Sequence, residues 1–139
     1  MKMEDFKYGD PERFIEDKYV LNDDEFVLVI EKDIFDEETV KYASGIVEKY
    51  LKEKDNIIEF LLEKRLRSFY KNIFSDEYIK SHLGKPQITI ISKKDESNPN
   101  WNHNYWGAID YVECELDGHI ISVEFLDDLD LIDRVQVDG

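Results

Sequence analysis

The sequence contains little cysteine and no long apolar run. Cys114 is the only cysteine among 139 residues, so no intrachain disulfide can form. Such sparse use of cysteine is typical of a reducing compartment. The longest apolar run, residues 26–30, is five residues long, whereas a membrane-spanning helix needs about 20. Because the first residues also lack the apolar core of a secretory signal, we expect a cytoplasmic protein that does not cross a membrane.

The motifs that usually identify catalytic, phosphate-binding or metal-binding sites are also missing. The six glycines are scattered, and there is no HExxH motif, CxxC motif or serine nucleophile elbow. Residues 127–133 resemble a calcium loop, but a loop starting at Asp128 would need an oxygen ligand at Ile132 and a glycine at Asp133. Three histidines and the cysteine follow no zinc-ligand spacing: His82, His103, His119 and Cys114. We therefore expect no metal, no cofactor and no enzymatic activity.

Positive charge is scarce and unevenly placed in this chain, whose formal net charge is −15. Residues 1–40 carry 14 acidic and 5 basic residues, and residues 41–94 carry 7 acidic and 12 basic residues. Residues 95–139 carry 12 acidic residues and one base, Arg134. Excess charge of one sign steers partners of the opposite sign, while nucleic acids and anionic membranes are themselves polyanions. We therefore expect a basic protein partner, and neither nucleic acid nor a membrane.

Helical periodicity fills the middle of the chain. Asp36 is followed by two glutamates and by apolar residues at helical spacing, which predicts a helix capped by Asp36. A second helix is predicted to begin at Asp55 or Asn56. A third is predicted to begin at Ser75 and to end at Gly84.

Strand patterns flank these helices. Residues 14–31 predict two strands around a turn at 22–24, residues 87–92 predict a β-branched strand, and residues 135–137 predict a last edge strand. We therefore expect an α+β fold in which two or three helices pack on one face of a mainly antiparallel sheet. The length suits a single domain, residues 1–139.

The Asp117-Gly118 pair between two apolar stretches predicts a two-residue hairpin of type I′. In that register Cys114 faces Ile121, and three carboxylates share the other face of the hairpin: Glu113, Glu115 and Glu124. Clustered carboxylates can perform acid–base chemistry or bind a metal. The solvated face of an antiparallel sheet has the same sequence pattern, and we favour that interpretation.

Two further segments admit two interpretations each. Residues 101–106 hold three large aromatics, which can anchor a protein interface or fold back as a plug for the core. The basic segment 64–67, together with Lys71, can bind an acidic partner or nucleic acid, or can form internal salt bridges with the acidic strands. For the basic segment we favour the internal salt bridges.

The order of these parts resembles a group of small bacterial domains of unknown function that recur near the immunity genes of polymorphic-toxin loci. The resemblance rests on the strand at 26–30, the helices of 37–83, the Trp106 strand with its closing hairpin, and the terminal Val135-Gln136-Val137. It implies an α+β fold without catalytic activity.

The resulting hypothesis is a non-enzymatic acidic binding module, an immunity-type protein that inhibits a cognate basic toxin. The candidate partner-binding residues combine the aromatic segment with exposed acids: Trp101, His103, Tyr105, Trp106, Glu113, Glu115, Glu124, Asp127, Asp128 and Asp130. The alternative is a small-ligand-binding protein or an enzyme with a site between the helices and the sheet. A homo-oligomer that buries the aromatic segment against its own copy is a third hypothesis.

Overall fold

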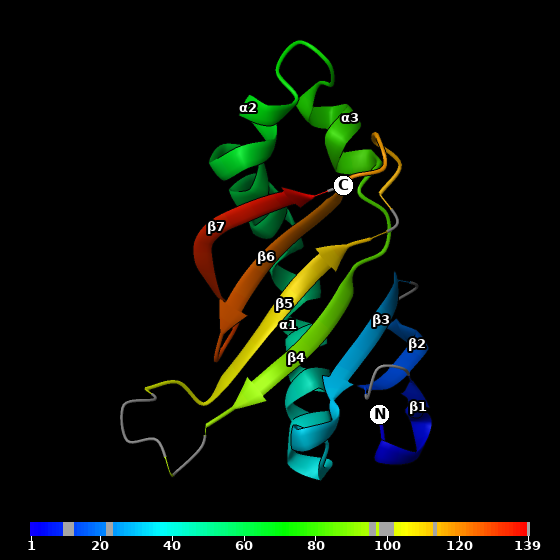
Figure 1. Cartoon of the computed structure of the whole chain (residues 1–139). Helices are drawn as coiled ribbons and strands as arrows, with labels where there is room; N and C mark the ends of the chain where they lie inside the picture. The colour runs from blue at the N-terminus through cyan, green and yellow to red at the C-terminus, as the bar shows by residue number, and fades with distance from the viewer. Residues whose placement is uncertain (10–12, 22–23, 95–96, 98–101, 113, 139) are drawn as a thin grey trace.

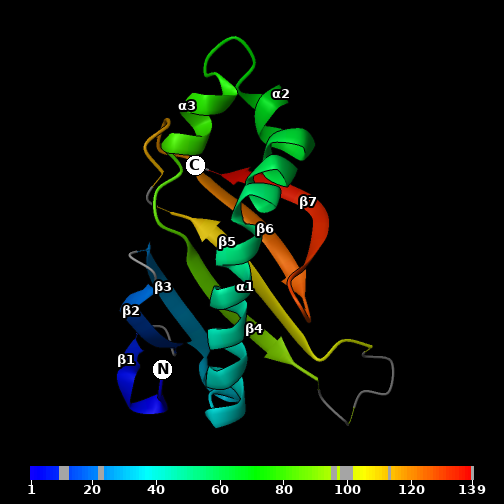
Figure 2. The same ribbon diagram turned by 180° about the vertical axis from the view of Figure 1, so that it is seen from behind.

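The computed structural model describes residues 1–9, 13–21, 24–94, 97, 102–112 and 114–138. These residues form one seven-stranded sheet in the order β1-β2-β3-β4-β5-β6-β7. The helices lie on one face of this sheet (Figures 1 and 2). All neighbouring strands are antiparallel except β3 and β4, which are parallel because the helical segment connects them. The predicted α+β fold with a mainly antiparallel sheet is thus confirmed.

The strands have the following bounds: β1 Lys7–Gly9, β2 Arg13–Leu21, β3 Asp24–Glu31, β4 Gln87–Lys93, β5 Tyr105–Tyr111, β6 Ile120–Leu126 and β7 Asp130–Asp138. The main helices are α1 Glu37–Leu61, α2 Arg67–Phe69 and α3 Asp76–Ser81, with a π-helical segment, η3 Leu62–Leu66, between α1 and α2. Two short 3₁₀ turns are η1 Met3–Asp5 and η2 Lys32–Ile34. Among the described residues, no helix combines the length and the apolar character needed to cross a membrane.

Helix α1 begins where the sequence predicts, because Asp36 caps it. The Asp36 carboxylate accepts a hydrogen bond from the Thr39 backbone N–H at 2.8 Å and another from Lys93 Nζ at 2.6 Å. Burial opposes ionisation of Asp36, but these hydrogen bonds outweigh it and lower the pKa of the carboxyl group. The cap therefore also ties the start of α1 to the end of β4.

The predicted second helix is wrong, because α1 runs without interruption through Asp55 and Asn56. Both of these polar residues are exposed, while Ile57, Ile58 and Leu61 continue the buried stripe of the helix. No proline or glycine interrupts the helix at this point, so Asp55 and Asn56 lie within α1 and do not act as N-caps. The helix predicted to begin at Ser75 is confirmed as α3, since the Ser75 hydroxyl accepts a hydrogen bond from the Tyr78 N–H at 3.1 Å.

The predicted type I′ hairpin at Asp117-Gly118 is also wrong. Strands β5 and β6 pair from Trp106 with Leu126 to Tyr111 with Ile121, so an eight-residue connection, 112–119, joins them. Gly118 has a positive φ of 84°, but Asp117 does not, and a type I′ turn needs both.

One hydrogen bond to α3 and one within the connection stabilise this longer connection in place of a tight turn. The Glu115 N–H donates to the His82 carbonyl oxygen of α3's C-cap at 2.8 Å, and Cys114 Sγ donates to the His119 carbonyl oxygen at 2.8 Å. Cys114 therefore does not face Ile121, and Glu115 and Glu124 do not share the face of a tight hairpin. Glu115 lies in the connection, Glu124 pairs with Ala108 within the sheet, and Glu113 lies outside the described residues.

The basic segment forms internal ion pairs. Lys64 Nζ lies 3.4 Å from the Asp133 carboxylate on β7, which is the kind of contact expected between the basic helix and an acidic strand. Arg67 instead binds two helix carboxylates, those of Glu59 and Asp76, each at 3.0 Å. All these side chains are at least one-third exposed, so the pairs orient the helices and add little stability.

The core between α1 and the sheet contains a buried polar contact. The hydroxyl oxygens of Tyr50 on α1 and Tyr111 on β5 lie 2.7 Å apart, and each side chain is at most 2% exposed. Burial raises the pKa of Tyr50 to about 12, so both hydroxyls stay neutral at physiological pH. One hydroxyl donates to the other across the interface, so this contact ties α1 to β5 within the core.

We expect Tyr50→Phe and Tyr111→Phe each to lower the free energy of unfolding by about 1–2 kcal/mol, because each leaves one buried hydroxyl without its partner. The double variant should be close to the better single variant, since it removes both polar groups together. Urea unfolding of the four proteins measures the coupling. Strictly additive losses would show that the two hydroxyls do not depend on one another.

Candidate partner-binding site

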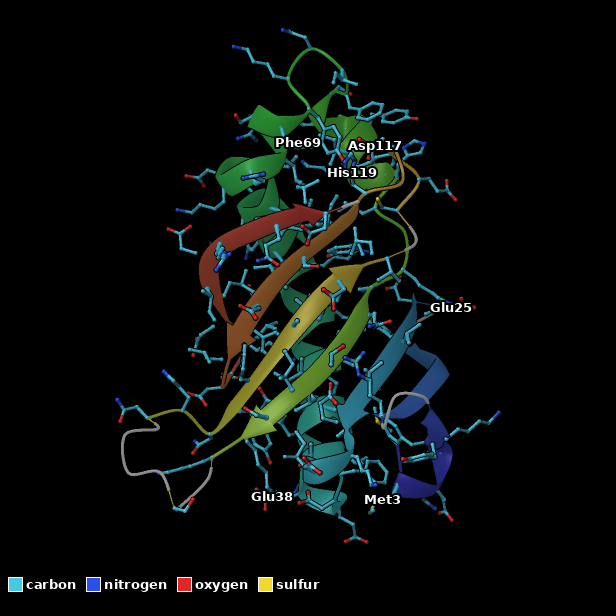
Figure 3. All side chains as sticks on the ribbon, in the orientation of Figure 1. Met3, Glu25, Glu38, Phe69, Asp117 and His119 are labelled. Atoms are coloured by element: carbon cyan, nitrogen blue, oxygen red, sulfur yellow. The ribbon has the colours of Figure 1, made fainter. Side chains whose placement is uncertain are left out.

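A groove runs along one side of α1, between this helix and the turn that joins β6 to β7. One part of it is a hollow of about 780 Å³ beside the start of α1. Two neighbouring hollows share Asp128 with it and extend past the exposed Gly45 as far as Glu53. The name α1 groove is used below for the surface formed by these residues: Glu38, Tyr42, Gly45, Tyr105, Asp128 and Asp130. Glu38 marks its outer end, near the start of α1 (Figure 3).

Two stacked tyrosines form the wall of the groove. The rings of Tyr42 on α1 and Tyr105 on β5 are nearly parallel, at 9°, with centroids 3.7 Å apart. The Tyr105 hydroxyl donates to the Glu38 carboxylate at 3.0 Å, and the Tyr42 hydroxyl donates to the Asp127 carbonyl oxygen. Burial, reinforced by the negative charge of Asp127, raises the pKa of Tyr42 well above its usual range. Both rings are therefore neutral and held in place.

Asp127 supports this wall from the β6–β7 turn. Its Oδ1 atom accepts hydrogen bonds from the backbone N–H groups of Asn104 at 2.6 Å and Tyr105 at 3.1 Å, and its Oδ2 atom lies 3.4 Å from His103 Nδ1. Burial opposes ionisation of Asp127, but these hydrogen bonds outweigh it and lower the pKa of the carboxyl group. Its φ of 47° is a left-handed conformation that aspartate and asparagine tolerate better than most residues. Asp127 is therefore part of the scaffold of the groove.

We expect Asp127→Ala to lower the free energy of unfolding by about 2–3 kcal/mol, because two backbone N–H groups lose their acceptor. Asp127→Asn is the matched control, since it keeps an acceptor oxygen and tolerates the positive φ. The folded pKa lies below the unfolded value of about 3.9. The carboxylate therefore stabilises the fold above that pH, and its contribution is lost as the pH falls through the folded pKa. Urea denaturation should show that the free energy of unfolding of wild type exceeds that of Asp127→Ala at neutral pH, and that this difference declines in acid. An equal loss of stability in Asp127→Asn and Asp127→Ala would contradict this role.

Both carboxylates and ammonium groups line the groove. Nine charged side chains lie among its described lining residues: Glu38, Glu53, Asp127, Asp128, Asp130, Lys41, Lys49, Lys93 and Lys94. Two of the lysines are held by carboxylates, Lys49 by Asp128 at 2.7 Å and Lys93 by Asp36 at 2.6 Å. The Asp128 side chain is nonetheless 81% exposed, so it remains accessible to a further cation.

The structure brings five of the candidate partner-binding residues together and separates three others from them. Tyr105, Asp128 and Asp130 line the groove, and His103 contacts Asp127 beneath it. Three others lie away from it, Trp106 and Glu124 on the opposite face of the sheet and Glu115 in the connection 112–119. The last two candidates, Trp101 and Glu113, are outside the described residues. Trp106 follows the buried Tyr105 directly, and successive side chains of a strand point to opposite faces.

Sequence reasoning missed the helical side of the groove, formed by Glu38, Tyr42 and Gly45. These residues are spaced by four and three positions, so they lie along one stripe of α1, beside its apolar face. In the sequence, the glycine at position 45, inside a predicted helix, is the one feature that indicates this surface. An added Cβ at this position would contact nothing within 4 Å, and yet a glycine inside a helix costs stability.

The chain matches none of the protein-family models, curated proteins or solved structures with which it was compared. The similarity to immunity-associated bacterial domains therefore stays a hypothesis.

Proposed function

We propose that this protein is a non-enzymatic binding module that holds a basic protein partner in the α1 groove. The observation that carries the proposal is the fixed Tyr42–Tyr105 wall with carboxylates on both sides of it, Glu38 from α1 and Asp128 from the β6–β7 turn. A lysine or arginine side chain in this hollow would lie beside the half-buried Tyr42 and would meet the carboxylates, which attract a cation. The rings are already ordered before binding, which lowers the entropic cost of association.

The groove has room for more than one partner residue. From Glu38 to Glu53 it follows α1 for roughly 22 Å, at 1.5 Å per residue. Gly45 leaves its middle unobstructed, and Asp130 provides a further exposed carboxylate towards the far end. An extended segment of the partner with two or more basic side chains would fit these positions.

The net charge of the chain supports the same partner. A protein of net charge −15 attracts basic proteins over a distance of about one Debye length, near 8 Å at physiological ionic strength. Such attraction raises association rates more than it raises affinity. The α1 groove then provides the short-range contacts that keep the partner bound.

In its finer form, the proposal is that the partner is a basic toxin, such as a nuclease, and that this protein is its immunity-type inhibitor. The resemblance noted in the sequence supports this assignment. Carboxylates that bind the basic residues of a nuclease would occupy positions that the phosphates of its substrate otherwise use.

A second candidate function is binding of a small molecule at the same place. The hollow of about 780 Å³ is in the size range of small-ligand sites, and Lys94 together with Lys93 gives it cations for an anionic ligand. A site of this kind, between the helices and the sheet, would suit a ligand-binding protein or an enzyme. The two candidate functions differ in the ligand that the protein would bind, a basic protein in the first case and a small anion in the second.

Affinity capture with matched baits tests the proposal. Wild-type protein, Gly45→Arg and Gly45→Ala are immobilised and exposed to extract from the cells that produce this protein, and the retained proteins are identified by mass spectrometry. We expect one basic protein on the wild-type and Gly45→Ala baits that is lost from Gly45→Arg, because arginine both fills the groove and repels the partner. A partner retained equally by all three baits, or an acidic one, would contradict the proposal.

A further inference from the structure

A row of aromatic rings crosses the end of the molecule that is opposite Glu38. Adjacent rings are 3.9–5.4 Å apart between centroids. The name aromatic end is used below for these residues: His119, Phe69, Tyr70, Phe74, Tyr78 and His82. Phe69, Asp117 and His119 lie together there, far from Glu38 (Figure 3).

This end concentrates the exposed apolar surface of the described chain. Phe69 is 39% exposed, Tyr78 is 40% exposed, and Ile73, in the turn between α2 and α3, is 67% exposed. Val112 and Ile120, at the two ends of the connection that packs against α3, are 41% and 39% exposed. Of the large apolar side chains that the structure describes as exposed, Tyr8 alone belongs to another region, on β1. A grouping of this kind marks an interaction surface.

The charge at this end differs from that of the rest of the chain. Residues 62–85 carry six bases and three acids, and the connection 112–119 carries three acids and no lysine or arginine. The two segments are therefore neutral together. Three carboxylates from outside them also reach this end, since Asp133 pairs with Lys64, Glu59 pairs with Arg67, and Asp138 lies opposite Ile120. The end is thus less acidic than the rest of the chain, which carries the net charge of −15. Both signs are also present within the patch, because Arg65 lies over the Phe69 ring at 5.7 Å and Glu115 is exposed near His82.

We propose that two copies of this chain associate through the aromatic end to form a symmetric dimer. Two molecules of net charge −15 repel one another over most of their surface, and this repulsion is weaker where both present a less acidic end. A two-fold interface requires a patch that is complementary to itself, and a patch with both signs of charge around an apolar centre suits that requirement. The dimer places Phe69, Ile73 and Tyr78 at its centre.

This arrangement leaves the hollow beside the start of each α1 at the far ends of the dimer. Helix α1 has 25 residues, so roughly 37 Å of helix separates the aromatic end from the cap at Asp36. Each copy therefore keeps this hollow open in the dimer. The inference goes beyond the proposed function and does not depend on it.

Sedimentation velocity of the full chain over a range of concentrations tests the dimer. We expect wild type to change from monomer to dimer as concentration rises, and Ile73→Asp to weaken this association at least about tenfold, because it puts a charge at the centre of the interface. Ile73 is exposed, so the variant should keep its fold, as circular dichroism can check. Tyr8→Asp is the matched control, since it removes an exposed apolar side chain on β1 and should leave the dimer intact.

Two results would overturn the dimer. One is a protein that stays monomeric at every concentration, including the case in which its aromatic end binds a different protein. The other is a dimer that neither Ile73→Asp nor Tyr78→Asp weakens, since such a dimer would use another surface.

Discussion

Replacing Gly107 with alanine is expected to lower the free energy of unfolding by about 3 kcal/mol, the upper end of the usual cost of overpacking. Gly107 lies on β5 in the centre of the sheet, where it pairs with Ile90 on one side and Phe125 on the other. A Cβ added there would stand 2.6 Å from the Thr89 carbonyl oxygen and would overlap the Phe125 ring. The carbonyl belongs to the backbone of β4, so it cannot move aside without disturbing the ladder.

Gly45→Ala is the matched control, because the same methyl group there meets no atom within 4 Å. That variant should raise the free energy of unfolding by about 0.5–1 kcal/mol, the usual gain of alanine over glycine within a helix. Urea denaturation of both variants gives the comparison. A neutral Gly107→Ala would show that β4 and β5 are not packed as closely as the structure has them.

The second large effect concerns the partner. Gly45→Arg is expected to raise the dissociation constant of the captured basic protein by at least about 100-fold, which corresponds to about 2.7 kcal/mol. The arginine side chain would extend from the middle of the α1 groove and place a positive charge beside Tyr42 and Asp128. Gly45→Ala should bind the partner nearly as wild type does, because one methyl group leaves most of the groove open.

Calorimetric titration of the three proteins with the purified partner measures this difference, with thermal unfolding as the control for folding. The result is informative because Gly45 is exposed and a side chain added there meets no packed neighbour within 4 Å of its Cβ. Arginine is also a better helix former than glycine, so loss of the fold is not the expected cause of lost binding. Unchanged affinity in Gly45→Arg would place the partner on another surface.

The sequence predicted local elements well where one chemical signal determined them. The caps at Asp36 and Ser75 both accept the hydrogen bonds that their types predict. The strand at 87–92 and the terminal strand at 135–137 are present as β4 and the longer β7. These elements follow from capping chemistry and side-chain alternation, which depend on a few neighbouring residues.

Predictions failed where distant contacts decided between local alternatives. Asp117-Gly118 has the composition of a tight hairpin, but the connection around it bonds to α3 through His82 and Glu115. The Tyr70 hydroxyl also donates to the Asp117 carboxylate at 2.9 Å. Nothing in the hairpin sequence reveals these partners, so the pairing of β5 with β6 is shifted by three residues from the predicted register.

The candidate site was predicted in part for a related reason. Tyr105, Asp127 and Asp128 carry signals of their own, as an aromatic segment and an acidic turn. Their neighbours Glu38 and Tyr42 are more than 60 positions away in the sequence and resemble any surface stripe of a helix. The fold alone brings them to the groove. In the fold, the Asp127 carboxylate also accepts hydrogen bonds from two backbone N–H groups, which the sequence did not reveal.

The most direct test of the central claim, that this protein binds a basic partner through the α1 groove, is the association rate measured by stopped flow. In the variant, lysine replaces three groove carboxylates: Glu38, Asp128 and Asp130. Asp127 is left in place because it supports the fold. We expect the rate for wild type to fall steeply from low to physiological salt, and the rate for the variant to be at least about tenfold lower at low salt. A rate that changes neither with salt nor with these reversals would contradict the claim.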